Sequence, residues 1–470
     1  MIYYLLSKIF LKRCCEMKKI LSILLTAVLF VSTFCFTSAN AAYDDAMEKM
    51  GLYSDCLLLV STDNGEVIFS KNANKQTAPA SLTKVITAIV VLENCSDLTA
   101  MVTVPESCIR ELDGTGSSLG GLMVGEQLSV YDLLCCLMLV SANESATTLA
   151  DYVSGGDRAK FVAMMNEVAE RLGCTNSHFE NPHGLDHDNQ YVTATDMAKF
   201  ITHAMSFSAF EEIVGRKTYV LPETNLQKSR TLHSSNYMLN SAYKDYYCKY
   251  VKGGKTGSTS QAGRCFVAVA SNDGYNYVAV ALNSVFRDVD NDGVNENGSF
   301  LDCKEMLEWT FKNIELVAIA DTTRVVGEVS VKYAKSADYI TLSPAETVYS
   351  LVPKGTDSGS LLVELIDAPE SVNAPVKKGD VICRGKVMYA GEVIKEIDLI
   401  SNMDAKISIF AFIGSSAKKV LSSWIFRIAA ILVIVFLIIL IIKKRKKDNS
   451  RPVSGKNYRV LSYNDFMKLR

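Results

Sequence analysis

An apolar run near the C-terminal end constrains the whole chain. Trp424–Ile442 is apolar except for Arg427, and a helix of this length spans about 28 Å at 1.5 Å per residue. That span matches the hydrocarbon core of a bilayer. The basic stretch KKRKK follows directly, and positive charge stays on the cytosolic side of a membrane. We therefore expect a transmembrane helix over 424–442, an extracytoplasmic body before it and a basic cytosolic tail over 443–470.

The N-terminal end has the features of a secretory signal. Two lysines precede an apolar run over 20–36, and alanines in A-x-A spacing follow it and end at Ala41. We expect a signal peptide over 1–41, which agrees with an exported body. Met17 directly precedes the lysines and is an alternative start of translation.

Composition excludes several classes of protein. The formal net charge of −2 predicts no basic surface for nucleic acid. Of 13 cysteines, those after the signal are scattered over apolar runs such as LLCCLMLV, without CxxC or metal-ligand spacing. We therefore favour buried free thiols over disulfides, and we expect no metal and no cofactor.

Two segments with different periodicity lie between the signal and the membrane helix. From 43 to 317, hairpin patterns at 56–72 and 263–284 enclose helical patterns, which predicts one α/β domain whose sheet gathers strands from both ends. From 322 to 405, apolar and polar residues alternate between turns, which predicts a small all-β domain. A juxtamembrane segment over 406–423 completes the body.

One predicted helix carries an unexpected pair of polar residues. The segment QTAPASLTKVITAIVVLEN (76–94) is apolar on nearly all sides after Pro79, so we expect a buried helix. Ser81 and Lys84 lie three residues apart and therefore share a face. A neutral lysine amine can take the proton of a serine, and burial or a nearby cation lowers a lysine pKa. The pair predicts a nucleophilic serine activated by a lysine.

A second motif, Ser141-Ala142-Asn143, lies within 129–153, whose spacing is helical. We expect Ser141 to relay a proton to a leaving amine and Asn143 to hold a substrate amide. Alone, a motif of this length is weak evidence, because such triplets occur by chance in a chain of this size.

A third motif, Lys255-Thr256-Gly257, is followed by Ser258. Lys255 would supply positive charge, and Gly257 would let a substrate backbone approach closely. We expect the backbone N–H groups of Ser258 and Ser81 to face a developing oxyanion. Together the three ordered motifs predict acyl transfer without a histidine base.

The motifs also carry a resemblance. PASLTK, SAN and KTGST resemble the active-site motifs of penicillin-binding proteins and serine β-lactamases. FVAMMNEVAERLGCTNSHFENPHGL (161–185) and GGKTGSTSQAGRCFVAVA (253–270) resemble low-molecular-mass D-alanyl-D-alanine carboxypeptidases, and the β segment resembles that family's C-terminal domain. The likeness implies a penicillin-binding-protein/β-lactamase-like transpeptidase fold, an antiparallel sheet flanked by helices. It implies removal of the terminal D-Ala from peptidoglycan stem pentapeptides and covalent inhibition by penicillins.

The chain departs from the family at one site position. Relatives carry an arginine in a G-R-F stretch where this chain has Ser299. A carboxypeptidase must still bind a terminal carboxylate. Serine cannot replace the two charge-assisted hydrogen bonds that an arginine guanidinium donates to a carboxylate. We hypothesise that Arg287, in the preceding insert, takes over; otherwise Thr256 and Ser258 bind the carboxylate more weakly.

Two other functions compete with the carboxypeptidase. A class A-type β-lactamase would need a deacylating glutamate on a loop, and no matching motif occurs. A catalytically weak wall scaffold is favoured by Ser299 and disfavoured by the intact serine and lysines.

Other polar residues are given structural interpretations. The stretch DVDNDG at 288–293 resembles the start of a calcium loop, but the twelfth position is Ser299, so a solvated loop is favoured. His183 is interpreted as a hydrogen-bonding residue rather than a base, Glu144 as a surface residue of a helix, and Arg264 as a residue on a sheet face.

Overall fold

The computed structural model describes residues 46–356, 361–389, 392–414 and 423–448. The predicted signal peptide and the end of the predicted tail, 449–470, lie outside these residues. The chain forms two compact units. The first unit extends to Ile319 and also contains a strand from later in the chain. The second unit contains most of the remaining strands and the C-terminal helix.

The first unit is built on a five-stranded antiparallel sheet in the order β2-β1-β9-β8-β7. It gathers strands from both ends of the unit, as the two hairpin patterns predicted. The β8–β9 hairpin turns at Asp273 and Gly274, whose φ angles of 51° and 86° suit a tight turn. Strand β7 is left at the edge of the sheet. The strands are β1 (Cys56–Ser61), β2 (Val67–Lys71), β7 (Val251–Thr259), β8 (Gly263–Asn272) and β9 (Tyr275–Ser284).

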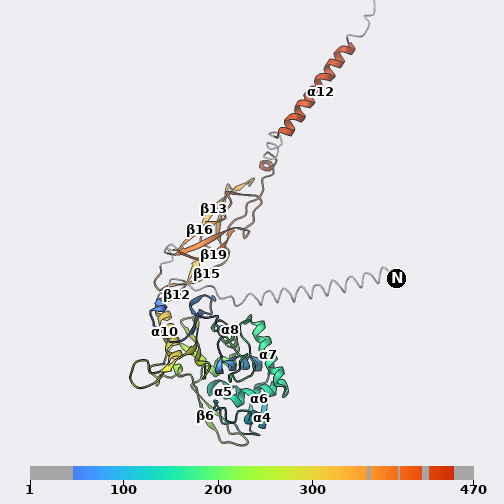
Figure 1. The fold of residues 1–470 in the computed structure, drawn as a ribbon. Coiled ribbons are helices and arrows are strands. Elements are labelled where there is room, and N and C mark those ends of the chain that lie inside the picture. Colours follow the sequence, from blue (N-terminus) through green and yellow to red (C-terminus); the bar gives the residue numbers. More distant parts are fainter. Residues whose placement is uncertain (1–45, 357–360, 390–391, 415–422, 449–470) are drawn as a thin grey trace, which may run out of the picture. The chain divides into compact units, whose positions relative to one another are not determined.

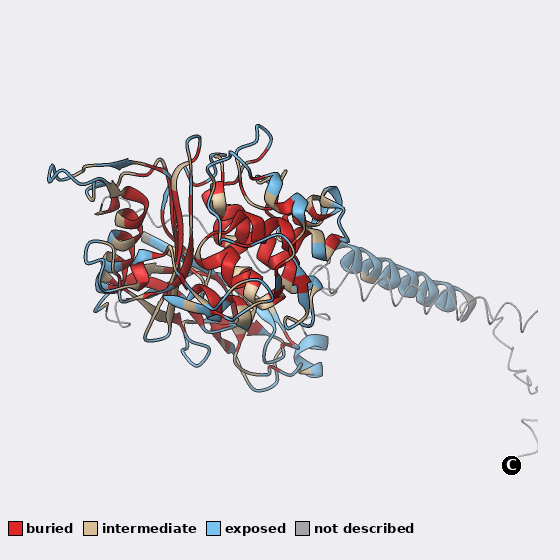
Figure 2. Ribbon diagram, turned by 90° about the horizontal axis from the view of Figure 1, so that it is seen from below, coloured by how far each residue is buried: buried red, intermediate tan, exposed pale blue. Residues whose placement is uncertain are grey.

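Helices cover both faces of this sheet (Figure 1). Alternate residues of β1 face opposite ways: Leu58 joins the core under the larger helical group, whereas Leu57 joins the core under α10. The larger group includes α3, which is buried from Thr83 to Val91, and its helices form the buried centre in Figure 2. The helices are α3 (Thr83–Asn94), α5 (Val130–Leu139), α6 (Asn143–Ser154), α7 (Arg158–Arg171), α8 (Ala194–Ala204) and, on the other face, α10 (Gly298–Asn313).

The helical pattern over 129–153 corresponds to two helices. A capping box between Ser129 and Asp132 begins α5. Helix α5 ends at Leu139, Ser141 has a left-handed φ of 62°, and α6 begins at Asn143. The break presents the second motif at the start of a helix.

Short elements complete the first unit. They are α4 (Glu106–Arg110), α9 (Ser208–Val214), η2 (Tyr237–Leu239), β3 (Met101–Thr103), β4 (Gln127–Ser129), β5 (Thr218–Leu221), β6 (Arg230–His233), β10 (Phe286–Arg287) and β11 (Glu296–Asn297).

Strand β12 (Ile314–Ala320) pairs with β15 (Val348–Pro353). Glu66 fixes β15 in this unit, because its carboxylate accepts hydrogen bonds from Ser350 Oγ and the Leu351 N–H at 3.0 Å each.

The second unit contains a six-stranded sheet in the order β16-β18-β19-β14-β13-β17. Its strands are β13 (Gly327–Lys332), β14 (Tyr339–Pro344), β16 (Leu362–Ile366), β17 (Ser371–Asn373), β18 (Val381–Tyr389) and β19 (Glu392–Ser401). Helix α12 (Trp424–Asp448) follows. Within its span Trp424–Lys446, an 18-residue stretch has a mean hydropathy of 3.4; the span is exposed (Figure 2) and long enough to cross a membrane. The predicted fold class, a helix-flanked antiparallel sheet, a small β domain and one C-terminal apolar helix, is confirmed.

The cysteines of the described residues are free thiols. All ten are buried except Cys95, which is half-buried. Burial raises the pKa of these thiols, for example that of Cys265 to about 12. They behave as small core residues, which agrees with the sequence interpretation.

Candidate active site

Ser81 lies in a short helical turn, η1 (Ala80–Leu82), directly before α3. Ala80 and Leu82 are buried, whereas Ser81 is half-buried. Ala80 adopts a left-handed φ of 47°, which is uncommon for alanine. The backbone of Gly184 packs against the carbonyl of Ala80 so closely that no side chain would fit there. The conformation around Ser81 is therefore held by a distant loop.

Lys84 connects three parts of the site. Its Nζ lies 2.8 Å from Ser81 Oγ, 2.6 Å from Asn143 Oδ1 and 2.6 Å from the carbonyl oxygen of His183. The side chain is fully buried. Burial lowers the pKa of Lys84 well below its ordinary value, the positive charge of Lys255 lowers it further, and Glu144 partly opposes both effects.

A second buried lysine faces the second motif. Lys255 Nζ donates to Ser141 Oγ at 2.9 Å and to the carbonyl of Thr256 at 2.9 Å. Burial lowers the pKa of Lys255 to about 7. Ser141, with its left-handed backbone, is buried. The three motifs thus meet through two lysine amines.

Strand β7 brings the third motif beside Ser81. A Cβ at Gly257 would lie 3.1–3.2 Å from Pro79 O, Ala80 Cβ and Leu82 N, so β7 packs directly on η1. Thr256 Oγ1 lies 2.8 Å from Ser235 Oγ, and Ser258 is exposed. The edge position of β7 leaves a place for an extended peptide beside the serine.

Sequence reasoning missed two contributors, Ser235 and the carbonyl of His183. Ser235 belongs to no motif, and backbone carbonyls carry no sequence signal. The imidazole of His183 accepts a hydrogen bond from the Leu185 N–H, and its pKa is lowered to about 3 by burial first and by Lys84 second. It is a structural residue, as interpreted.

The interpretation of Glu144 as a surface residue is wrong. Its side chain is 1% exposed, and Oε1 accepts hydrogen bonds from the N–H groups of Gly120 (2.6 Å) and Leu122 (3.3 Å). Burial raises the pKa of this carboxyl. Glu144 follows Asn143 at the start of α6 and fastens the 118–122 loop beside the site, where Asn143 N–H also donates to the Ser118 carbonyl.

The expected carboxylate ligands lie in different environments. Ser299 is fully buried and donates to Asn297 Oδ1 at 2.7 Å. Arg287 is exposed on β10, where it pairs in register with Glu296 of β11. Arg264 lies on β8, as expected for a sheet residue, and its side chain reaches Ser258.

The acidic insert has the form of a hydrogen-bonded loop. Asp288, Asp290 and Glu296 place carboxylate oxygens close together. Backbone N–H groups also donate to them: Asp288 accepts from Asn291 and Gly293, and Glu296 from Val289. The solvated loop stays a prediction from the sequence.

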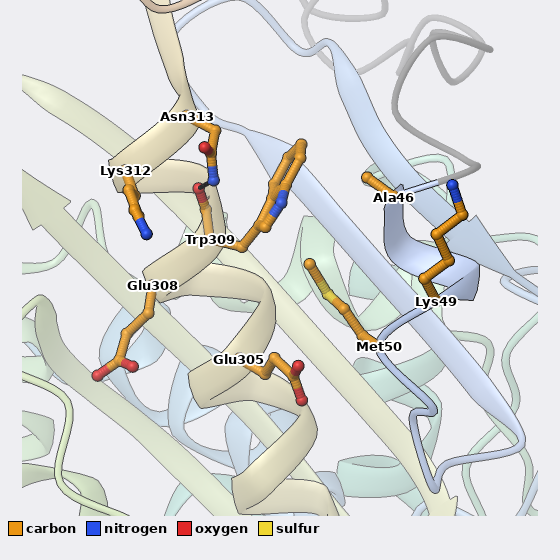
Figure 3. Close-up of a pocket in the computed structure, with 8 residues that line it drawn as sticks. All are labelled: Ala46, Lys49, Met50, Glu305, Glu308, Trp309, Lys312 and Asn313. Atoms are coloured by element: carbon orange, nitrogen blue, oxygen red, sulfur yellow. Dashed lines mark hydrogen bonds between the residues drawn. The ribbon is translucent and has the colours of Figure 1, made fainter.

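A hollow of about 370 Å³ lies between α10 and the first described turn (Figure 3). It is lined by Ala46, Lys49, Met50, Glu305, Glu308, Trp309, Lys312 and Asn313. It contains none of the motif residues. Because α10 covers the sheet face opposite the helices around Ser81, this hollow is separate from the candidate active site.

Comparison with known proteins identifies the family. Residues 44–285 match the family model described as D-alanyl-D-alanine carboxypeptidase, and 315–406 match the C-terminal domain of penicillin-binding protein 5. The chain belongs to the D-alanyl-D-alanine carboxypeptidase family. The predicted recognition is thereby confirmed: this is a low-molecular-mass penicillin-binding protein of the serine DD-carboxypeptidase type.

Several relatives span most of the chain. The carboxypeptidase DacF of Bacillus subtilis is 26% identical over 87% of this chain and 99% of its own. DacC of Escherichia coli is 30% identical over 75% and 84%. The crystal structure of penicillin-binding protein 5 from Haemophilus influenzae matches with a TM-score of 0.60 at 26% identity, over 76% and 98%. The Streptomyces K15 DD-transpeptidase matches with a TM-score of 0.50 at 27% identity, over 56% and 98%.

The close packing of Gly184 on Ala80 predicts a sensitive position. In Gly184→Ala the added Cβ would lie 1.9 Å from Ala80 O and 2.9 Å from Thr83 Oγ1. Gly114→Ala is the matched control, because Gly114 has a similar φ of 73° and open space around it. We expect about 1–2 kcal/mol of backbone cost in both variants, with a larger fall in unfolding free energy and slower penicillin acylation only in Gly184→Ala. Urea unfolding and acylation kinetics measure this, and equal effects in both variants would contradict it.

Proposed function

We propose that the protein is a membrane-anchored DD-carboxypeptidase that removes the terminal D-Ala from peptidoglycan stem pentapeptides through an acyl-enzyme on Ser81. The observation that carries this proposal is the buried Lys84 amine, 2.8 Å from Ser81 Oγ. No histidine is needed as a base, and no cofactor takes part.

The hydrogen bonds of Lys84 support its role as general base. A neutral amine has two N–H donors and one lone pair. The Asn143 and His183 oxygens can accept the two N–H groups, which leaves the lone pair for the Ser81 hydroxyl. Ser81 Oγ then attacks the carbonyl of the penultimate D-Ala while its proton passes to Lys84.

The second lysine and Ser141 serve the leaving group. The tetrahedral intermediate collapses by breaking the peptide bond, and the departing D-Ala amine needs a proton. Ser141, whose Oγ accepts a hydrogen bond from Lys255, relays it, and Lys255 supplies positive charge. Water then hydrolyses the ester, with Lys84 again taking a proton.

The remaining residues of the site bind substrate. The N–H groups of Ser81 and Ser258 face the oxyanion, and Asn143 holds a substrate amide through its NH₂ group. Thr256, Gly257 and Ser258 line the edge strand, where the peptide lies extended. Penicillins acylate the same serine and act as covalent inhibitors.

In the proposed organisation of the chain, this site lies outside the membrane. We propose a catalytic domain over 43–317, a β-rich domain over 322–405 that spaces it from the bilayer, and a juxtamembrane segment over 406–423. The apolar span over 424–442 and the basic residues that follow it support a cytosolic tail over 443–470.

The competing functions are not favoured. A class A-type β-lactamase would need a deacylating glutamate on a loop, and no matching motif occurs in the sequence. A scaffold without activity would not need two buried lysines, because burying each amine costs stability.

The proposed function predicts release of D-Ala from a D-Ala-D-Ala peptide by the purified ectodomain. Ser81→Ala should abolish turnover and covalent labelling by fluorescent penicillin. Lys84→Ala should slow acylation by about 10²–10⁴-fold, the usual value of a general base, with little change in reversible binding. Labelling that survives Ser81→Ala would remove it as the nucleophile, and an unchanged acylation rate would assign the proton to another group.

The proposed topology predicts protection of the tail. Protease added to intact protoplasts should digest the catalytic domain and spare an epitope placed after Lys446, because KKRKK holds that end in the cytosol. Lysed protoplasts are the control, in which both parts are digested. Loss of the epitope with survival of the catalytic domain would reverse the orientation.

A further inference from the structure

Arg264 stands directly opposite Ser258 in the β7–β8 ladder. Directly paired residues of antiparallel strands project from the same face of a sheet. The guanidinium accordingly donates from Nη1 to Ser258 Oγ at 3.0 Å. Ser258 follows Gly257, which packs on the turn that carries Ser81. The Arg264 side chain thus contacts β7, the strand that we propose binds substrate.

The guanidinium is held from its other side by an aromatic ring. The Cζ atom of Arg264 lies 4.1 Å from the ring centroid of Phe286, a cation–π distance. Phe286 begins β10 and is 51% exposed, although large apolar side chains are usually covered. Stacking orients the guanidinium plane while its edge remains available for a planar anion.

No carboxylate of the described residues forms an ion pair with Arg264. Its guanidinium donates instead to Ser258 Oγ, which is a neutral group. Other arginines of the first unit are matched with acids: Arg158 pairs with Asp151, and Arg230 with Glu126. An arginine oriented by stacking, next to an exposed serine and without its own acid, has the chemistry of a carboxylate site.

We propose that Arg264 binds the terminal carboxylate of the substrate, together with the hydroxyls of Ser258 and Thr256. This assignment rests on the proposed carboxypeptidase function. Thr256 and Ser258 are two residues apart on β7 and share the face from which Arg264 projects. The carboxylate of the leaving D-Ala would accept N–H bonds from the arginine fork, while Lys255, on the other face, serves the chemistry.

The two other candidate positions for a carboxylate ligand, Ser299 and Arg287, are less suitable. Ser299 is fully buried in the first turn of α10 and has its own acceptor. Arg287 follows Phe286 on β10, and successive side chains of a strand point to opposite faces. With the Phe286 ring against Arg264, Arg287 points to the other face of the β10–β11 ribbon.

The test compares two substrates of the full ectodomain, a D-Ala-D-Ala peptide with a free carboxylate and its C-terminal amide. Arg264→Ala should lower kcat/KM on the acid by about 10- to 100-fold, the usual value of charge-assisted hydrogen bonds, and change it less than about twofold on the amide. Arg264→Lys should fall between Arg264→Ala and the native enzyme on the acid, because lysine keeps the charge without the fork. Arg171→Ala, a surface arginine of α7, is the charge-matched control.

The other possible outcomes would overturn either the carboxylate assignment or the proposed function. Equal losses on acid and amide in Arg264→Ala would assign it a structural role and overturn the inference, as would a native enzyme that hydrolyses both substrates equally. An acid-selective loss in Arg287→Ala, with none in Arg264→Ala, would assign the carboxylate to Arg287. A native enzyme that releases no D-Ala from the acid would instead overturn the proposed function itself. Thermal unfolding of each variant separates these effects from misfolding.

Discussion

The burial of the Lys84 amine beside Ser81 is the interaction on which the rest of the site depends. A charged ammonium in this position would lose its hydration, at an effective cost of several kcal/mol. The structure reduces that cost with three oxygen partners, and the lowered pKa favours the neutral form. The same contacts hold the amine against the hydroxyl that it deprotonates. The contacts of the Lys84 amine therefore both stabilise its burial and position it to activate Ser81.

That arrangement requires four segments to meet. The turn before α3 carries Ser81, α6 carries Asn143, a loop supplies the His183 carbonyl, and β7 brings Lys255. Glycines at 184 and 257 allow backbone to approach backbone at the two tightest junctions. Ala80, whose backbone is left-handed, lies at both junctions, where tertiary contacts maintain a conformation that is locally unfavourable.

The structure changed the interpretation of two residues, Glu144 and Arg264. Glu144 looked like a surface residue because charged residues seldom lie inside, yet loop N–H groups satisfy one oxygen of its buried carboxylate. Arg264 looked like an ordinary sheet residue. Only the register of β7 against β8 and the placement of Phe286 put its guanidinium beside the proposed substrate strand.

Elements whose signals are local could be predicted from the amino-acid sequence alone. Alternating residues and Asn-Asp-Gly predicted the β8–β9 hairpin, apolar length predicted α12, and ordered motifs indicated the chemistry of Ser81, Lys84 and Lys255. Features that depend on contacts between distant segments became visible only in the folded chain. The break between α5 and α6, the role of the His183 carbonyl, Ser235 beside Thr256 and the burial of Glu144 all belong to this group. Periodicity reports the environment of a residue's own element, whereas a partner dozens of residues away is specified only when packing brings the two together.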